Sequence, residues 1–256
     1  MGSLIKQECF KLSKKKSTWI WPIVIIAIMI TLLFISQNSD IMSSEGLIQG
    51  GFSGFYWVVI LMIVQASTII SMEFHYETIK NVLYRNYSRT SIVISKVITL
   101  VIYSLICFIG VIAVTLLLYA ISFNDIDLLA PHGSHQPPLL NEMLLLAVAD
   151  FVTMWLVLSL TLLISCAMKG PTLSITIGIF FYFVMSFVAA LLTYFNGKWE
   201  WFKWNPLNMI MLPQQIVDND FKEMSHLELH ELFIGNIVYI VIFLVLLVFV
   251  FKKKNV

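Results

Sequence analysis

The chain has 256 residues, of which 59% are apolar and only 12% charged, and its mean hydropathy is +0.88. A soluble domain could not bury so much apolar surface, because such domains are ordinarily about half apolar and about a quarter charged. The composition therefore excludes a soluble enzyme and indicates an integral membrane protein. The formal net charge of +1 says little until the charges are sorted by side of the membrane. Three scattered cysteines are too few for a disulfide framework, so we interpret them as unpaired thiols.

Six segments are long and apolar enough to cross a membrane as helices. A span needs about 20 mainly apolar residues, because a helix rises about 1.5 Å per residue across a hydrocarbon core of about 30 Å. The alternation of apolar and polar residues that is typical of barrel strands is absent. We therefore predict an all-α membrane protein with a single transmembrane domain, 1–256, whose spans are Thr18–Ser36, Phe52–Met72, Val97–Ile121, Met143–Ala167, Leu173–Phe195 and Leu232–Phe251.

The basic residues predict the orientation of these spans. Lysine and arginine near the ends of spans are retained in the cytoplasm. If both termini are inside, 13 of the 16 basic residues lie on the inner side, and only Lys198, Lys203 and Lys222 lie outside. We therefore expect a multi-pass protein of the plasma membrane with both termini in the cytoplasm.

Two segments outside the spans have a distinct pattern. Residues 1–17 carry apolar residues at roughly helical spacing with lysines between them, which predicts an amphipathic helix along the inner leaflet. Residues 196–231 carry three tryptophans and are interrupted at Pro206 and Pro213. Because tryptophan favours the headgroup level, we expect two short re-entrant helices here that enter the outer leaflet.

The loop predicted at 73–95 resembles the first cytoplasmic loop of ABC-2 type transporter permeases. In that family an acidic residue ends the second span, a Gly-Thr-leucine-like turn and a short helix follow, and an arginine and a lysine lead into the third span. Glu77 departs from the pattern, because it stands where glycine is usual. The lysine-rich start of the chain and the proline-bearing segment before the last span are also similar to the family. The matching loop residues are Glu73, Thr78, Ile79, Leu83, Arg89 and Lys96.

The resemblance implies a transport subunit that is not itself an enzyme. The helix near Glu73–Tyr84 would be a coupling helix that seats on an ABC ATPase, and a Glu73–Arg89 ion pair could fix the two ends of the loop. The further implied partners are a second permease copy or a sister permease, membrane lipid, and an amphipathic peptide cargo such as phenol-soluble modulins or antimicrobial peptides, in a Gram-positive bacterium. The implied ATPase-coupling residues are Glu73, Glu77, Thr78, Ile79, Lys80, Leu83 and Arg89.

Nucleotide chemistry is not expected on the chain itself. The sequence contains no G-x-x-x-x-G-K-[ST] phosphate loop, so we expect no cofactor on this chain, and ATP and Mg would bind to the partner ATPase. Nucleic acid is not an expected partner, because the basic residues are spread along the inner membrane face. His226 and His230 are spaced by one helical turn, which would suit zinc or simply a solvated acidic helix.

Asp150 is the one ionisable residue well inside a predicted span. A carboxylate at that depth costs about 3 kcal/mol on insertion scales, so we expect it to face the bundle interior, a cavity or a partner. It would serve either as a polar point in the substrate pathway or as a structural hydrogen-bond partner of hydroxyls such as Ser159. The aromatic side chains of Phe181 and Phe187 would suit an amphipathic substrate, but such residues also face lipid.

Three other readings stay open at this point. An ion-coupled secondary transporter would need more intramembrane charge than Asp150 alone provides. A non-transporting sensor or immunity protein would act without an ATPase. An intramembrane enzyme has the least support, because no nucleophile and base lie at one depth of the membrane.

Overall fold

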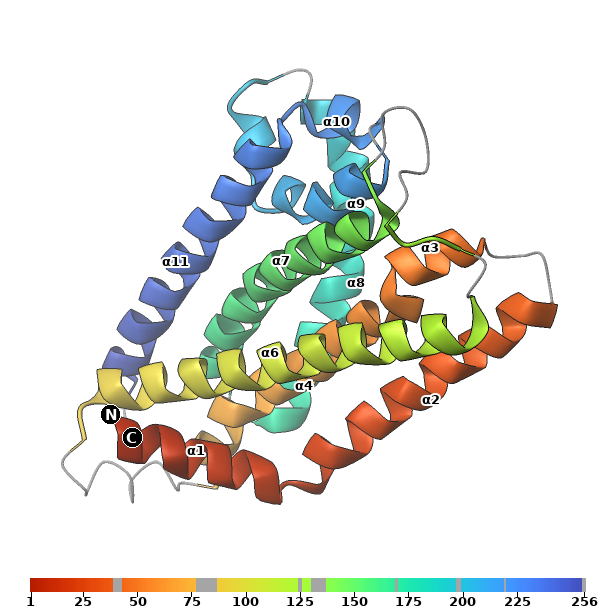
Figure 1. Ribbon diagram of the computed structural model, residues 1–256. Coiled ribbons are helices and arrows are strands. Elements are labelled where there is room, and N and C mark those ends of the chain that lie inside the picture. The colour runs from red at the N-terminus through yellow and green to blue at the C-terminus, as the bar shows by residue number, and fades with distance from the viewer. Residues whose placement is uncertain are drawn as a thin grey trace.

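The computed structural model describes residues 1–38, 43–76, 87–123, 126–129, 137–168, 170–196, 199–218 and 220–254, without the side chains of 185, 186 and 189–196. Every regular element within these ranges is a helix (Figure 1). The prediction of an all-α protein is therefore confirmed.

The first half of the described chain consists of a helix at the amino terminus followed by three long helices and two short ones. In chain order these elements are α1 (Gly2–Lys14), α2 (Lys16–Asn38), α3 (Ser44–Gln49), the 3-10 helix η1 (Gly51–Ser53), α4 (Gly54–His75) and α6 (Arg89–Ser122). The second half contains α7 (Leu139–Ala167), α8 (Pro171–Asn196), η2 (Phe202–Trp204), η3 (Asn208–Met211), α9 (Leu212–Val217), α10 (Asp220–Ser225) and α11 (Leu229–Lys253).

Five helices are long and apolar enough to cross a membrane: α2, α4 together with η1, α6, α7 and α11. This finding confirms a membrane protein with several candidate spans. The remaining predicted span, Leu173–Phe195, is also helical, because it lies within the 26-residue helix α8. Its apolar stretch with fully described side chains, Pro171–Val184, is shorter than a span, so the count of six remains a prediction.

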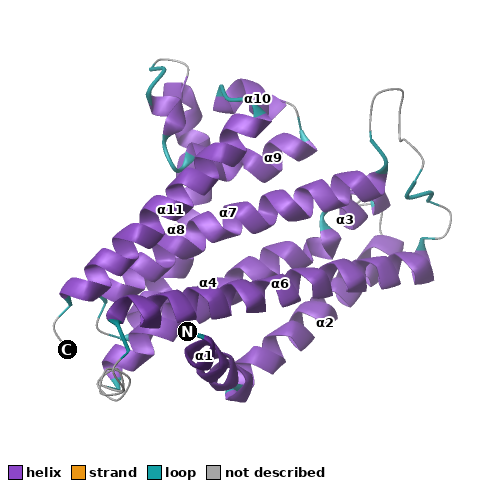
Figure 2. Ribbon diagram, turned by 60° about the vertical axis from the view of Figure 1, so that its left-hand side comes forward, coloured by secondary structure: helices purple, strands orange, loops and turns teal. Residues whose placement is uncertain are grey.

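Helices α4 and α7 form the centre of the bundle. In their apolar windows 67% and 61% of residues are buried, compared with 22% in α2 and 17% in α11. In Figures 1 and 2 the two central helices lie between α11 on one side and α2 on the other. The outer helices expose apolar side chains such as Ile109 and Val245. Such exposure suits lipid, which solvates these groups as well as a protein core does.

The two termini and several helix ends meet at one end of the bundle, which we call the terminal end. The side chain of Arg89, the first residue of α6, reaches the end of α11 and donates hydrogen bonds to the carbonyls of Lys252 (2.9 Å) and Lys254 (2.7 Å). The Lys254 ammonium in turn donates to the carbonyls of Cys166 and Met168, at the end of α7. From this end α6 and α11 diverge toward the opposite end, as Figures 1 and 2 show.

Helices α4 and α6 extend into the loop predicted at 73–95, so that only residues 76–88 separate them. Helix α6 begins eight residues before the predicted span because the Ser88 hydroxyl accepts a hydrogen bond from the Ser91 N–H (3.1 Å) and caps it. Its first turns are also held by Ile92 and Val93, which are buried. With 34 residues, α6 is about 51 Å long, well beyond a hydrocarbon core of about 30 Å.

A proline inside α2 links this helix to α6. Pro22 has no N–H to donate to the carbonyl of Thr18, four residues earlier. The Tyr103 hydroxyl of α6 donates to that carbonyl instead, over 3.0 Å. Thr18 and Tyr103 are both buried, so this hydrogen bond satisfies a group that water does not reach.

The segment 196–231 contains four short helices among its described residues, where we expected two, and it packs on α7, α8 and α11. Its buried amide side chains fix its path: Asn208 donates to the carbonyls of Lys203 (2.7 Å) and Ser225 (2.9 Å), and Gln215 donates to the carbonyl of Leu227 (3.2 Å). Its three tryptophans are exposed. The depth of this segment in a membrane stays a prediction.

Candidate functional site

A group of four charged side chains, three of them buried, lies at the terminal end, and we call it the charge cluster. It consists of Glu8 and Lys11 from α1, Glu73 from α4 and Lys96 from α6. The Lys96 ammonium binds Glu8 (2.9 Å) and Glu73 (2.8 Å), and the Lys11 ammonium binds Glu8 (2.7 Å) and Glu73 (2.9 Å). The two carboxylates and the two ammonium groups therefore balance, with no excess charge within the cluster.

The cluster is buried to different depths on its two sides. Lys96 is 1% exposed, whereas the side chain of Lys11 is 52% exposed at the rim. A charge removed from water is tolerated only where it is paired and hydrogen-bonded, which explains why Lys96 has two carboxylate partners. Burial by itself lowers the pKa of Lys11, but hydrogen bonds and attraction from Glu8 and Glu73 outweigh it and raise this pKa above its ordinary value.

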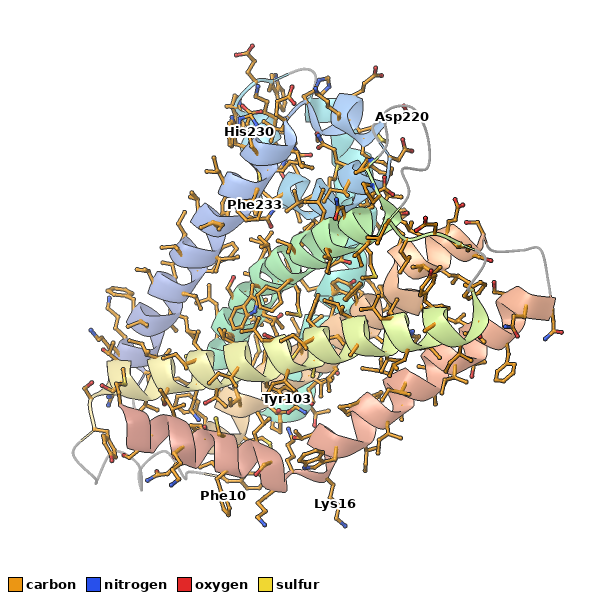
Figure 3. The ribbon with its side chains drawn as sticks, viewed as in Figure 1. Phe10, Lys16, Tyr103, Asp220, His230 and Phe233 are labelled. Carbon is orange, nitrogen blue, oxygen red and sulfur yellow. The ribbon has the colours of Figure 1, made fainter. Side chains whose placement is uncertain are left out.

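The spacing of residues along α1 explains how the cluster forms. Leu4, Glu8 and Lys11 are separated by four and three residues, so they share one face of the helix, and Leu4 and Glu8 are buried on it. Phe10 lies on the opposite side and is exposed, as Figure 3 shows. The ion pairs therefore hold α1 against both α4 and α6.

The structure separates the two charged residues that we expected to pair across the loop. Glu73 binds the lysines of α1 and α6, whereas Arg89 binds carbonyls at the end of α11. The predicted Glu73–Arg89 ion pair is therefore wrong, because a different helix supplies the partner of each residue. The other residues expected to couple to an ATPase lie outside the described residues: Glu77, Thr78, Ile79, Lys80 and Leu83.

Sequence reasoning missed Glu8 and Lys11 as members of a site. A signal was present, because Glu8 is the only acidic residue in α1 and lies on the same face as the buried Leu4. An acid on the apolar face of a lysine-rich helix indicates a buried basic partner. The sequence does not say that this partner is Lys96, which belongs to a helix 88 residues away.

The three residues that we placed in a substrate pathway have different surroundings. Asp150 is partly buried on α7, and it forms no hydrogen bond or ion pair with the part of the chain that the structure describes. The Ser159 hydroxyl donates to the Leu156 carbonyl of its own helix (2.8 Å), so the alternative of a structural bond to Asp150 is not realised there. Phe181 packs against a buried apolar cluster to which α7, η3, α9 and α11 contribute, and Phe187 is 68% exposed.

The histidine pair does not share a helical face. His226 adopts a left-handed backbone conformation (φ 53°) before α11, whereas His230 lies inside that helix (Figure 3). The expectation that both lie one turn apart on one helix is therefore wrong. Among the described residues, no group of three or more histidine, cysteine, aspartate and glutamate side chains is placed to hold a metal ion.

An apolar cavity of about 500 Å³ opens between α1, α2 and α6, next to the charge cluster. Pro22 and Tyr103 line it, together with apolar residues of α2 and α6 such as Ile25 and Ile106. The bend between α1 and α2 leaves this space, which hydropathy along the chain does not reveal. Its size and lining suit an acyl chain or the apolar side chains of a peptide.

The family described as "Protein of unknown function (DUF2705)" matches residues 24–256. The chain belongs to this family. The matched range includes Glu73 and Lys96 of the charge cluster, whereas α1, with Glu8 and Lys11, precedes it. No curated protein matches the chain.

Proposed function

We propose that the chain is the membrane-spanning permease subunit of an ATP-driven exporter. In this proposal α1 is an interface helix on the inner leaflet, and the segment 76–88 contains the coupling helix that seats on a separate ABC ATPase. The cargo is hydrophobic or amphipathic, most simply a peptide. The protein resides in the plasma membrane of a Gram-positive bacterium.

The charge cluster is the observation that carries this proposal. It joins α1 to the last turn of α4 and to the third turn of α6, and these two helices border the segment 76–88. A force applied to this segment by an ATPase would therefore act on α1, α4 and α6 together. Because buried, paired charges resist separation, the three helices would move as one body.

The arrangement of helix ends supports six spans with both termini in the cytoplasm. The hydrogen bonds from Arg89 to Lys252 and Lys254, and from Lys254 to Cys166 and Met168, place the ends of α11 and α7 beside the start of α6. Figure 1 places the amino terminus at the same end. Termini on one side require an even number of spans, so α8 would be the sixth. The basic residues gathered at this end favour the cytoplasmic side.

A second permease copy or a sister permease would complete the transport path. Helices α2 and α11 bury little of their apolar surface within one chain, so they offer faces to lipid or to another permease. The 500 Å³ cavity between α1, α2 and α6 offers apolar surface to the amphipathic cargo. In the absence of a nucleotide-binding motif, the chain depends on its ATPase partner for energy.

The proposal is tested by purifying the tagged chain in mild detergent from its native membrane and identifying co-purified proteins by mass spectrometry. We expect a stoichiometric ABC ATPase with the wild-type chain and its loss with Leu83→Asp. The matched control is Leu129→Asp, because Leu129 is an exposed leucine between α6 and α7, distant in sequence from the coupling segment. Retention of the ATPase by Leu83→Asp, or a chain that purifies alone from active cells, would contradict the proposal.

A second candidate, an ion-coupled secondary transporter, is favoured by Asp150. Its carboxyl group lies within α7, and no described residue forms a hydrogen bond or ion pair with it, so it is available to bind a proton. If this function is correct, cargo movement continues after ATP depletion and stops in Asp150→Asn. If movement stops on ATP depletion and survives in Asp150→Asn, the exporter proposal stands.

A further inference from the structure

Lys15 is a lysine that turns into the bundle at the junction of α1 and α2. It has an extended backbone conformation, and the next residue begins α2. Its ammonium donates hydrogen bonds to the Gln65 side-chain oxygen (3.0 Å) and to the Thr68 hydroxyl (2.8 Å), both on α4. The neighbouring lysines Lys14 and Lys16 are exposed instead. Figure 3 shows Lys16 pointing away from the bundle.

The charge of Lys15 is not balanced by any acid in the described part of the chain. Its carboxylate neighbours, Glu8 and Glu73, are already paired with Lys11 and Lys96. Burial lowers the pKa of Lys15, with no opposing attraction from a carboxylate. Two of its three N–H groups have neutral acceptors on α4, which leaves the third for another acceptor.

Gln65 provides a second unsatisfied donor at the same place. It is 1% exposed, and its side-chain nitrogen is buried without a hydrogen-bond partner among the described residues. The oxygen of the same amide accepts from Lys15, so the nitrogen is left as a donor. A buried donor without an acceptor costs free energy, and this cost is removed when an acceptor enters.

Both donors line a cavity of about 270 Å³ between α1 and α4. Glu8, Lys11 and Glu73 of the charge cluster lie on one side of it, and their charges are neutralised by the ion pairs already described. The remaining wall consists of the apolar Leu12, Ile69 and Met72 and of Thr68, whose hydroxyl accepts from Lys15. The cavity therefore combines one unbalanced cation and one free amide donor with an apolar wall.

We propose that this cavity binds a phosphate group through Lys15 and Gln65. A phosphate oxygen accepts well from both an ammonium and an amide N–H. The apolar wall favours a phospholipid of the leaflet on which α1 lies, with its acyl chains beside Leu12, Ile69 and Met72; free phosphate would use the same donors. The site does not depend on the exporter proposal, because it requires neither an ATPase nor a cargo.

The test compares ligands with and without phosphate on the full chain. Native mass spectrometry in detergent would measure binding of phosphatidylglycerol against diacylglycerol, which has the acyl chains but no phosphate. We expect phosphatidylglycerol to be preferred, and its affinity to fall about tenfold or more in Lys15→Gln and in Gln65→Leu. Lys15→Arg, which keeps the charge, should retain the preference. Lys16→Gln is the matched control, because it removes an equal charge one residue away.

A second measurement separates the two sources of phosphate. Melting temperature with added inorganic phosphate would be recorded for wild type, Lys15→Gln and Lys16→Gln in neutral detergent. If inorganic phosphate raises the melting temperature, only Lys15→Gln abolishes this rise, and phosphatidylglycerol is not preferred over diacylglycerol, the results support the site with free phosphate as its ligand. Equal weakening of phosphatidylglycerol by Lys15→Gln and Lys16→Gln would overturn the proposal, because any surface lysine would then suffice. A response to neither ligand would also overturn it.

Discussion

Replacement of Lys96 with methionine should release α1 from the rest of the bundle. Lys96 is the most deeply buried member of the charge cluster, and it bridges Glu8 of α1 and Glu73 of α4. Methionine has a similar length but no charge. The substitution leaves two buried carboxylates side by side, with only the half-exposed Lys11 to neutralise them. Separation of α1 from α4 is the simplest way to relieve this repulsion.

The size of the effect follows from burial. Removal of one partner from a buried ion pair destabilises a protein by about 3–5 kcal/mol, so the undocked fraction of α1 should rise at least about a hundredfold. The side chain of Lys11 is 52% exposed, and exposed pairs contribute about 0–1 kcal/mol. Lys11→Met should therefore raise the undocked fraction by no more than about fivefold. The two lysines bind the same carboxylates, which makes them a matched pair.

The native Cys9 provides the assay. Its sulfur lies 3.8 Å from the Thr99 hydroxyl of α6 and is partly covered while α1 is docked. In a chain whose Cys107 and Cys166 are replaced by alanine, the rate at which a water-soluble maleimide modifies Cys9 reports the undocked fraction. We expect a large increase for Lys96→Met and a small one for Lys11→Met.

Two outcomes would refute this reasoning. An unchanged rate in Lys96→Met would mean that the buried ion pairs do not hold α1. Equal increases in both variants would mean that burial does not set the strength of the pairs. The combination Glu8→Gln with Lys96→Met removes two opposite buried charges and should restore part of the protection, because it leaves a better balance than the single variant does.

Three further predictions concern pH, the end of α11 and helix packing. The pKa of Lys11 is raised in the folded protein, so the contribution of Lys11 to docking of α1 is full below its unfolded pKa of 10.5 and disappears as pH rises through its folded pKa. The fluorescence anisotropy of a dye attached at Phe10→Cys should therefore fall only in that alkaline range. Arg89→Gln removes two hydrogen bonds to the last carbonyls of α11, so carboxypeptidase should digest the carboxyl terminus faster, and an unchanged rate would argue against this role. A Cβ at Gly178 would lie 3.0–3.2 Å from side chains of α4 and α7, whereas one at Gly110 would meet nothing within 4 Å. Gly178→Leu should therefore lower the free energy of unfolding in detergent by about 1–3 kcal/mol, and Gly110→Leu should lower it much less. Equal losses of stability would contradict close packing of α8.

Hydropathy alone predicted the long apolar helices, because lipid forces every spanning backbone to satisfy its own hydrogen bonds. It did not predict where the helices end. Helix α6 begins at Arg89 because the Ser88 cap and the buried Ile92 and Val93 add two turns to the apolar span that starts at Val97. Caps and first turns carry polar residues, so a window that averages apolarity excludes them. Short helices such as α3, which follows α2, were not predicted for the same reason.

The charge cluster could be predicted only in part. Glu73 and Lys96 were recognised as residues at the borders of a loop, and opposite charge at the two ends of that loop suggested Arg89 as the partner of Glu73. The actual partners depend on the docking of α1, which brings Glu8 next to Lys96 across 88 residues. Local pattern gives the face of a helix but not the helix that covers it. The cavities could not be predicted either, because they depend on the angles between helices, which the local sequence pattern does not give.

The hydrogen bond between Tyr103 and the Thr18 carbonyl ties the first turn of α2 to α6. Pro22 deprives that carbonyl of its own helical donor, and in hydrocarbon no water replaces a donor that withdraws. Any movement of α2 away from α6 that widens the 500 Å³ cavity therefore leaves the Thr18 carbonyl without a hydrogen-bond donor, unless an incoming molecule supplies one. A peptide, with its backbone N–H groups, can meet this requirement, whereas a simple hydrocarbon chain cannot. Under the exporter proposal, a route for cargo between α2 and α6 would therefore select by hydrogen bonding as well as by apolarity.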